Sequence, residues 1–463
     1  MIVLTPEQQI IKEYVTANEG IVLVSAGPGT GKTFMAERII QELSPSRVLY
    51  TAFNKAIVEE AKERFGTYEV QCKTLHAVAY QYAKPHGEIR PTNYRDLPET
   101  LSYDLKYKIL QELEKFLVSN SVDMWDYFEN AFKTDRNKEL LVHSATDVVN
   151  AMLDKKLPWS FSFLLKYFHL MLTENPSACC YDLVIMDEIN DTTAVALEIF
   201  KLIKAPRKLG VGDPHQAIYS FLNLVNGFEE LKDIPIYSLT HSFRCSKEIA
   251  SRIENFMVKE VSPEIKFKGT DDPIANGKTL YCTMTNAAIV NELARCIRQR
   301  KQFLLLRKPS DIFACPLAVT SASNGKEVYQ TQYKYLQDVY TDWKSSKKTK
   351  ENFYGYLLTE LNDQEIHNAV KLLLNLGKEI NLFKLYNDVK QVKQGGDYTI
   401  ATVYTSKGLE FETVILSDEF NTRIESARQG STQIEDRLAI CKCMYVACSR
   451  AGKYLLNAGT LDV

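Results

Sequence analysis

The stretch that most limits how this chain can fold lies near its N-terminus. Residues 21–25 (IVLVS) form an apolar, largely β-branched run, long enough for one buried strand. The run breaks into AGPGTGKT at residues 26–33, and residues 34–43 follow with helical spacing. Glycines let backbone N–H groups turn inward around phosphates at the start of a helix. The order therefore predicts a strand, a phosphate-binding loop and a helix.

Two side chains of this loop carry chemistry. Lys32 is expected to reach the β- and γ-phosphates of a nucleoside triphosphate, and the Thr33 hydroxyl is expected to bind Mg²⁺. Ala26 stands at the first motif position, where Gly is usual. A chance Gly-rich turn is the alternative, but the strand before the loop and the helix after it favour a nucleotide site.

Composition limits the classes of protein that remain. A chain of 463 residues is too long for one ordinary core, so we expect two to four domains. No apolar run reaches membrane-spanning length, and the first residues lack the pattern of a signal peptide. We therefore expect no membrane contact and a cytoplasmic protein, bacterial or in a phage-infected host cell, or a nuclear one. The net charge of −2 does not exclude nucleic acid, because a local basic groove can bind phosphates.

The ten cysteines fit the same compartments. Cys179 and Cys180 are adjacent, and Cys441 and Cys443 are one residue apart. The sequence contains no CxxC pair and no Cys/His spacing typical of zinc sites. We therefore expect buried free thiols.

The order of apolar runs predicts two sheet regions separated by helical segments. The first strands are expected at 47–53, 70–73, 182–186, 208–212 and 234–239, with a helix at 56–65. The second set is expected at 279–284, 302–306, 398–404, 413–417 and 454–458. Helical patterns fill 81–176 and most of 316–395, where KSSKKTKE at 344–351 is expected to be a solvated loop or, alternatively, a DNA-backbone contact.

Two acidic residues complete the pattern of a nucleotide hydrolase. Asp187 and Glu188 directly follow the apolar run at 182–186. At the carboxyl end of a parallel strand, Asp187 could hold Mg²⁺ and Glu188 could orient the attacking water. Arg244 and Arg450 are candidates for stabilising transition-state charge, although a single Arg more often forms a surface salt bridge.

Nine stretches occur in a characteristic order: LTPEQQ, AGPGTGKT, YTAFNKAIVEEA, TLHAVAY, VIMDEIND, VGDPHQAIYSF, LTHSFRCS, TVYTSKGLEFETVIL and YVACSRA. Together they resemble the superfamily 1A DNA helicases of the UvrD/Rep/PcrA type. FSFLLKYFHLML and GDPHQAIYSF are most similar to the F-box DNA helicase branch. The resemblance implies an α/β fold of two RecA-like parallel-sheet P-loop domains, each with a mainly helical insertion. The implied segments are 1–80 and 177–245 for domain 1A, 81–176 for insertion 1B, 246–315 and 396–463 for domain 2A, and 316–395 for a reduced insertion 2B.

The resemblance also implies roles for individual residues, with ATP and Mg²⁺ as cofactors bound between the two RecA-like domains. Gln8 would read the adenine edge, Phe243 would stack on the base, and Glu410 would contact the nucleotide from the second domain. Gln216 would sense the γ-phosphate, and Arg244 and Arg450 would be arginine fingers. The phosphates and Mg²⁺ would be held by Gly27, Gly29, Thr30, Gly31, Lys32, Thr33 and Asp187.

Single-stranded DNA would face a second group of residues. By resemblance these are Phe53, Asn54, Thr74, His76, Tyr219 and Phe221. Aromatic residues suit this task because every base offers a π-face. Core packing is at least as probable for each aromatic taken alone, and His76 could equally be a hydrogen-bonded structural residue.

Several positions depart from the family pattern. Leu222 and Asn223 replace the usual Arg-Gly, Asn190 stands for the Gln of DEAQD, and Tyr404 replaces a His. None of these changes removes a primary catalytic group, so they bear on coupling rather than on hydrolysis.

The resemblance implies an ATP-dependent 3′→5′ translocase and helicase, with the polarity taken from the family alone. Its substrates would be single-stranded DNA and junctions of single- and double-stranded DNA. We expect a monomer, with replication or recombination proteins as possible partners. Two alternatives are a DNA-stimulated ATPase that remodels recombination intermediates or protein filaments, and a nucleotide-switched DNA-binding module. RNA is a further, less favoured substrate.

Overall fold

The structure, a computed structural model, divides the chain into two compact units. They comprise Met1–Thr240 and His241–Val463. The described residues are 4–52, 55–85, 87–219, 223–345, 352–361, 363–376, 381–430 and 434–462.

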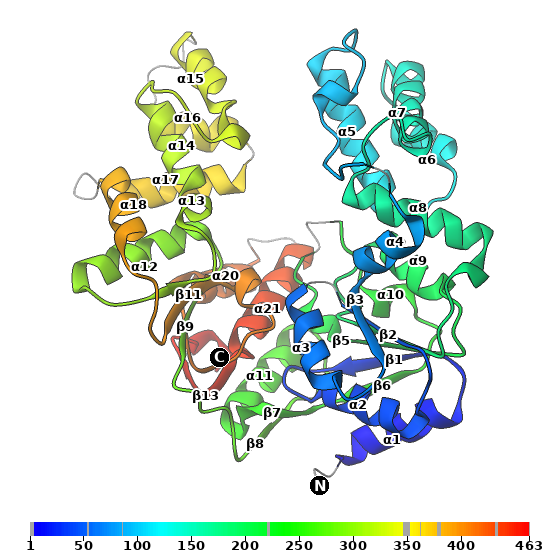
Figure 1. Ribbon diagram of the computed structural model, residues 1–463. Helices are drawn as coiled ribbons and strands as arrows, with labels where there is room; N and C mark the ends of the chain where they lie inside the picture. Colours follow the sequence, from blue (N-terminus) through cyan, green and yellow to red (C-terminus); the bar gives the residue numbers. More distant parts are fainter. Residues whose placement is uncertain are drawn as a thin grey trace. The chain divides into compact units, whose positions relative to one another are not determined.

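A six-stranded parallel sheet forms the centre of the first unit (Figure 1). Its strands are β1 (Gly20–Ala26), β2 (Val48–Ala52), β3 (Val70–Thr74), β4 (Leu183–Asp187), β5 (Arg207–Gly212) and β6 (Ile236–Leu239). The order across the sheet is β3-β2-β4-β5-β1-β6, and every pair is parallel. All carboxyl ends therefore meet at one edge, where parallel sheets bind ligands.

Alternation along β1 explains why both faces of this sheet are covered. Val22 and Val24 belong to one apolar cluster, and Leu23 belongs to the other. The first cluster contains side chains of α1 (Pro6–Ala17), α2 (Lys32–Leu43) and α3 (Lys55–Phe65). The second contains α9 (Ala194–Leu202) and helices that precede β4 in the chain. Successive strand residues point to opposite faces, so an unbroken apolar run fits a doubly covered sheet.

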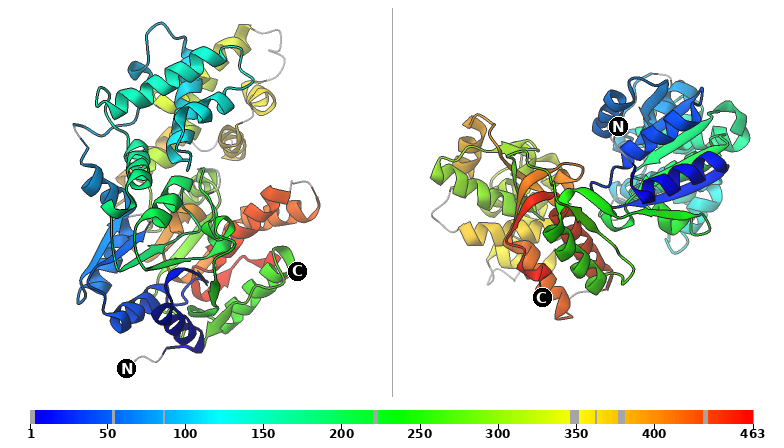
Figure 2. Two further views of the ribbon diagram at one scale, coloured as in Figure 1. Left: turned by 90° about the vertical axis from the view of Figure 1, so that its right-hand side faces the viewer. Right: turned by 90° about the horizontal axis from the view of Figure 1, so that it is seen from below.

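Helices occupy much of the stretch from 81 to 176, where helical patterns were expected. They are α5 (Tyr103–Val118), α6 (Met124–Ala131), α7 (Lys138–Leu153) and α8 (Phe161–Glu174), and they follow α4 (Leu75–Ala83). Figure 1 and Figure 2 show α5, α6 and α7 extending away from the sheet, with α4, α8 and α9 nearer to it. Trp159 anchors the start of α8, since it is buried and its indole Nε1 donates to Met152 O at 2.8 Å.

The second unit contains another parallel sheet. Its five strands are β9 (Thr279–Thr283), β10 (Leu304–Leu305), β11 (Tyr398–Thr402), β12 (Phe411–Leu416) and β13 (Ala451–Leu456), in the order β10-β11-β9-β12-β13. The flanking helices are α11 (Lys247–Glu260), α12 (Asn286–Gln299), α18 (Leu382–Gln391), α20 (Asp418–Arg428) and α21 (Ile434–Cys448). A separate apolar cluster unites α14 (Ala314–Ser323), α15 (Leu336–Ser345), α16 (Phe353–Glu360) and α17 (Gln364–Leu376).

The predicted fold class is confirmed, with small corrections to element boundaries. A strand was expected to continue to residue 404, but β11 ends at Thr402. The Thr402 hydroxyl caps the short helix α19 (Val403–Ser406), which follows directly. A two-stranded sheet of β7 (His241–Ser246) and β8 (Lys268–Thr270) was not predicted. The first compact unit ends at Thr240. The four-segment division itself remains a prediction.

Two further expectations concern the surface and the cysteines. Among the described residues, no helix combines the length and apolar character needed to cross a bilayer. All ten cysteines are free thiols, and all are buried except Cys180, which is half-buried. Most of the KSSKKTKE stretch, residues 346–351, lies outside the described residues.

Candidate nucleotide-binding and catalytic site

The loop after β1 has the backbone of a phosphate cradle. Gly29 and Gly31 adopt φ values of 71° and 80°, a left-handed conformation that favours glycine. The Thr30 hydroxyl donates to Gly27 O at 2.8 Å and closes the turn. Helix α2 begins at Lys32, and no described side chain caps its first turn. The N–H groups of this turn can therefore bind an anion.

Lys32 lies beside both acidic residues that follow β4. Its Nζ is 2.5 Å from Glu188 Oε1 and 3.7 Å from Asp187 Oδ1. Burial by itself would lower the pKa of Lys32, but the charges of Glu188 and Asp187 outweigh it and raise the pKa above its usual value. The structure thus places Lys32, the residue predicted to bind phosphate, beside the Asp-Glu pair, with both carboxylates largely buried.

Glu188 occupies an unusual backbone conformation. Its φ is 56°, in the left-handed region that costs a residue with a Cβ roughly 1 kcal/mol or more. The backbone N–H of Glu188 donates to Asp187 Oδ1 at 2.9 Å. The sharp turn directs the two neighbouring side chains to different positions, although they are adjacent in sequence.

The loop after β5 is tied to the loop after β4 through Asn190. The buried Asn190 Oδ1 accepts from Asp213 N at 3.0 Å, and Gln216 Nε2 donates to Asp213 Oδ2 at 2.9 Å. Gly212 makes room for this link, since a Cβ there would lie 2.3 Å from Asn190 Oδ1. The shorter amide of Asn190 therefore spans the gap, and Gln216 is held near the carboxyl end of the sheet.

Gln8 is buried, and its amide contacts the phosphate loop. Its Oε1 accepts from Thr5 N at 3.1 Å, and its Nε2 donates to Thr30 O at 3.2 Å. Both ends of the amide are therefore engaged within the first unit. Its role in reading adenine stays a prediction.

The described residues of the predicted DNA-binding group have structural partners. The Thr74 hydroxyl caps α4 by accepting from Ala77 N at 3.3 Å. The His76 ring meets Phe161 edge to face, with centroids 5.9 Å apart, and burial lowers the pKa of His76. Tyr219 is half-buried. The described residues do not include Phe53, Asn54, Phe221 or Leu222.

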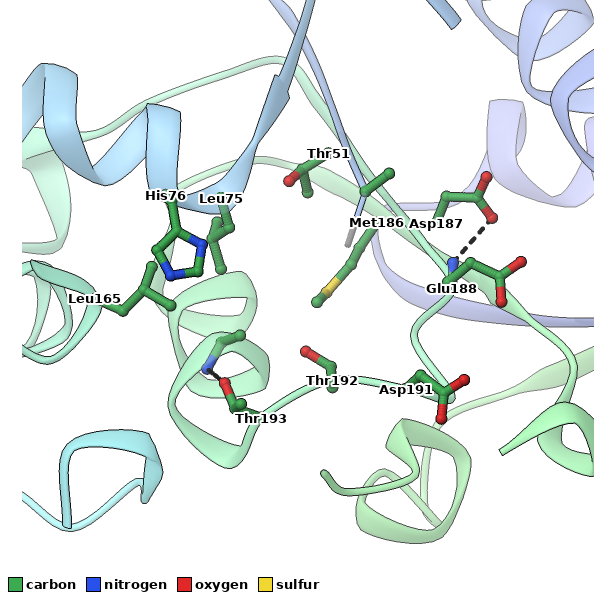
Figure 3. A pocket seen from close by; sticks show the side chains of 12 residues that line it. Thr51, Leu75, His76, Leu165, Met186, Asp187, Glu188, Asp191, Thr192 and Thr193 are labelled. Atoms are coloured by element: carbon green, nitrogen blue, oxygen red, sulfur yellow. Dashed lines mark hydrogen bonds between the residues drawn. The ribbon is translucent and has the colours of Figure 1, made fainter. Parts of the chain in front are cut away.

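A small cavity lies between the acidic pair and His76 (Figure 3). Thr51, Met186 and Leu165 also line it, and its volume is about 70 Å³. Ligand pockets usually measure about 300–1,000 Å³, so this cavity is too small for a nucleotide. It separates the candidate catalytic carboxylates from the candidate DNA-binding helix α4 within one unit.

Three predicted residues of the second unit lie together. Arg244 Nε is 3.2 Å from Glu410 Oε2, and Arg244 Nη1 donates to Ser449 O at 3.2 Å. Arg450 is only 2% exposed, and its guanidinium donates to Val446 O, Leu409 O and the Ser449 hydroxyl.

Two aromatic residues of the second unit differ in environment. Phe243 is 46% exposed, and its ring meets that of His241 edge to face. This exposure leaves the ring accessible. Tyr404 stands where the family has His, and its hydroxyl lies 3.7 Å from Cys443 Sγ.

Comparison with known proteins agrees with this geometry. A family model described as the UvrD/REP helicase N-terminal domain matches residues 4–233. The chain belongs to the UvrD/Rep-like superfamily 1 helicases. It is 26% identical to F-box DNA helicase 1 of Gallus gallus, over 99% of this chain and 49% of that protein. It is also 26% identical to F-box DNA helicase protein 1 of Schizosaccharomyces pombe, over 99% of this chain and 58% of that protein. The chain spans about half the length of these curated relatives.

A shorter match links the chain to another helicase. ATP-dependent DNA helicase SRS2 of Saccharomyces cerevisiae is 24% identical over 51% of this chain and 25% of that protein. The UvrD/Rep-like assignment thus rests on several relatives that are named as DNA helicases.

One residue at the site of this UvrD/Rep-like chain was missed by sequence reasoning. Tyr50, on β2, donates its hydroxyl to Asp187 Oδ2 at 2.5 Å. A signal was present, because a buried Tyr usually needs a hydrogen-bond partner for its hydroxyl. The partner could not be named, since the sequence does not state that β2 lies beside β4.

Proposed function

We propose that the chain is an ATP-dependent DNA translocase and helicase. The observation that carries the proposal is the convergence of Lys32, Asp187 and Glu188 at the carboxyl end of the parallel sheet, beside an uncapped helix N-terminus. DNA is the proposed substrate because the relatives are named as DNA helicases. Single-stranded DNA and its junctions with duplex, and 3′→5′ polarity, are proposed from the family pattern.

The residues present fit a magnesium-nucleotide complex. Thr33, half-buried in the first turn of α2, and Asp187 offer the oxygen ligands that Mg²⁺ prefers. When bound, Mg²⁺ would neutralise charge on the β- and γ-phosphate oxygens. The loop N–H groups and Lys32 would bind the same phosphates from the protein side.

The ion pair between Lys32 and Glu188 gives the reaction an order of events. While its Oε1 accepts from Lys32, the Glu188 carboxylate is neutralised and is a weaker base towards a water. A triphosphate competes for Lys32, so nucleotide binding would release Glu188 to act as the base. Arg244, Arg450 and Glu410 are proposed to act on the same nucleotide from the second unit.

The decisive experiment combines two assays. ATP hydrolysis is measured with and without single-stranded DNA, and unwinding is measured on forked, 3′-tailed and 5′-tailed duplexes. We expect DNA to stimulate hydrolysis and the 3′-tailed duplex to be unwound. Equal hydrolysis with and without DNA would contradict a translocase and favour a nucleotide-switched binding module. Stimulated hydrolysis without strand separation would favour the remodelling of protein filaments.

A further inference from the structure

We propose that Tyr50 is a positioning residue that fixes the orientation of the Asp187 carboxylate for Mg²⁺. This proposal rests on the proposed function, because it concerns the same metal-nucleotide site. Tyr50 belongs to none of the groups to which the sequence assigned a catalytic or binding role.

The geometry gives each oxygen of Asp187 its own donor. Oδ2 accepts from the Tyr50 hydroxyl at 2.5 Å, and Oδ1 accepts from Glu188 N at 2.9 Å. Lys32 Nζ lies 3.7 Å from Oδ1. A carboxylate bound through both oxygens cannot rotate freely about its Cβ–Cγ bond. Its lone pairs are therefore directed before a metal arrives.

The ring of Tyr50 is held independently of this hydrogen bond. Tyr50 is 1% exposed, and it pairs with Ile185 of β4 in register. Its ring meets Phe65 of α3 edge to face, with centroids 5.2 Å apart. Apolar packing thus fixes the ring and directs the hydroxyl towards the end of β4. A tyrosine hydroxyl is protonated at neutral pH, so it can donate to the carboxylate.

Hydrogen bonds to metal-binding carboxylates usually matter for metal affinity. Their removal typically costs about 10- to 100-fold in metal affinity or activity. In Tyr50→Phe the ring stays, and only the donor to Oδ2 is lost. We therefore expect weaker binding of Mg²⁺ with little change in nucleotide binding without metal.

The test compares Tyr50→Phe with the unaltered protein in two measurements. The first is the affinity for fluorescent ADP with and without Mg²⁺, which needs no turnover, and the second is direct Mn²⁺ binding by electron paramagnetic resonance in the presence of ADP. We expect the metal-dependent affinities to fall about 10-fold or more, and the metal-free ADP affinity to stay within about twofold. The melting temperature, followed in parallel, reports on folding.

Tyr181→Phe is the matched control. Tyr181 is also a buried tyrosine of the first unit, and its hydroxyl donates to Gln71 Oε1 at 3.2 Å. It precedes the first residue of β4, whereas Asp187 is the last residue of that strand. The control should leave metal binding unchanged. Equal metal affinity in Tyr50→Phe and the unaltered protein would overturn the proposal, and so would an equal loss of metal-free ADP binding. Because neither measurement requires hydrolysis, absent ATPase activity would count against the proposed function alone.

Discussion

Lys32 Nζ and Glu188 Oε1 lie 2.5 Å apart, so the expected phosphate ligand and the expected general base neutralise each other. Replacing Glu188 by Gln removes the charge that competes with a triphosphate for Lys32. We expect Glu188→Gln to bind ATP as tightly as the unaltered protein or more tightly, and to hydrolyse it about 10²- to 10⁴-fold more slowly. Equilibrium binding of a fluorescent ATP analogue and single-turnover hydrolysis would measure the two effects. Retained turnover would rule out Glu188 as the base.

Gly212 should not tolerate a side chain. In Gly212→Ala the new Cβ would lie 2.3 Å from Asn190 Oδ1, so the bond from Asp213 N to Asn190 must break or shift. We expect a loss of about 1–3 kcal/mol in the free energy of unfolding, with reduced hydrolysis. Urea denaturation and an ATPase assay would measure both.

Two further variants test the cause of the Gly212 effect. Gly66→Ala is the control, because a Cβ at Gly66 would meet its nearest atoms at an ordinary 3.4 Å. The double variant Gly212→Ala/Asn190→Ala lacks the clash between the new Cβ and Asn190 Oδ1. The double variant should therefore lose less free energy of unfolding than the two single variants lose together. Additive losses would argue against the steric explanation.

Arg450 should contribute to the stability of the second unit as well as to any role at the nucleotide. Arg450→Ala would remove a buried guanidinium and its bonds to Val446 O, Leu409 O and the Ser449 hydroxyl, although Val446 O would still accept from the Ser449 hydroxyl. Truncating a large buried side chain also leaves a cavity, and such changes cost about 2–5 kcal/mol. We therefore expect the free energy of unfolding to fall by at least about 2 kcal/mol by urea denaturation. Arg307→Ala, at an exposed position, should change it by less than about 0.5 kcal/mol; equal effects would contradict the structural role.

His169 should make the first unit less stable in acid. It is buried in α8, and its Nδ1 has no hydrogen-bond partner among the described residues. Burial, with a smaller effect of the Lys166 charge, lowers the pKa of His169 from 6.5 to about 4, while Glu198 and Lys201 of α9 act in opposite directions. The unfolded chain therefore binds a proton below pH 6.5 that the folded chain binds only near pH 4. Stability should fall by about 3 kcal/mol as the pH falls through this range.

Unfolding curves between pH 7 and pH 4 would test this pH dependence. His169→Leu should flatten the curve in this range, because it removes the group that titrates. His143→Gln, at an exposed position of α7, should not change it. An unchanged slope in His169→Leu would assign the acid sensitivity to other groups.

The fold could be predicted from the sequence where local pattern decides it. The run at 21–25, the glycines at 29 and 31 and the helical spacing after Lys32 each specify local backbone, and the structure agrees with them. The approach of Lys32 to Asp187 was also predictable, because both follow the carboxyl ends of parallel strands. The short β7 and β8 were missed, since their runs are brief and lack clear alternation.

Contacts that depend on strand order could not be predicted. The hydrogen bond from Tyr50 to Asp187 requires β2 to lie beside β4, although more than 100 residues separate them in the chain. The burial of Arg450 depends on how α21 packs onto β12 and β13, which the YVACSRA motif does not specify. Predicted roles at Phe53, Asn54 and Phe221 stay predictions, because these residues lie outside the described part of the chain.

The left-handed backbone of Glu188 is a strained conformation at the residue proposed as the base. Asn and Gly adopt this conformation more readily than Glu, but either substitution would also remove the nearest carboxylate of Lys32, which is largely buried. Relief of roughly 1 kcal/mol of strain does not offset the loss of a buried ion-pair partner. A stabilised form of the protein must therefore keep Glu at this position and gain its stability elsewhere in the chain.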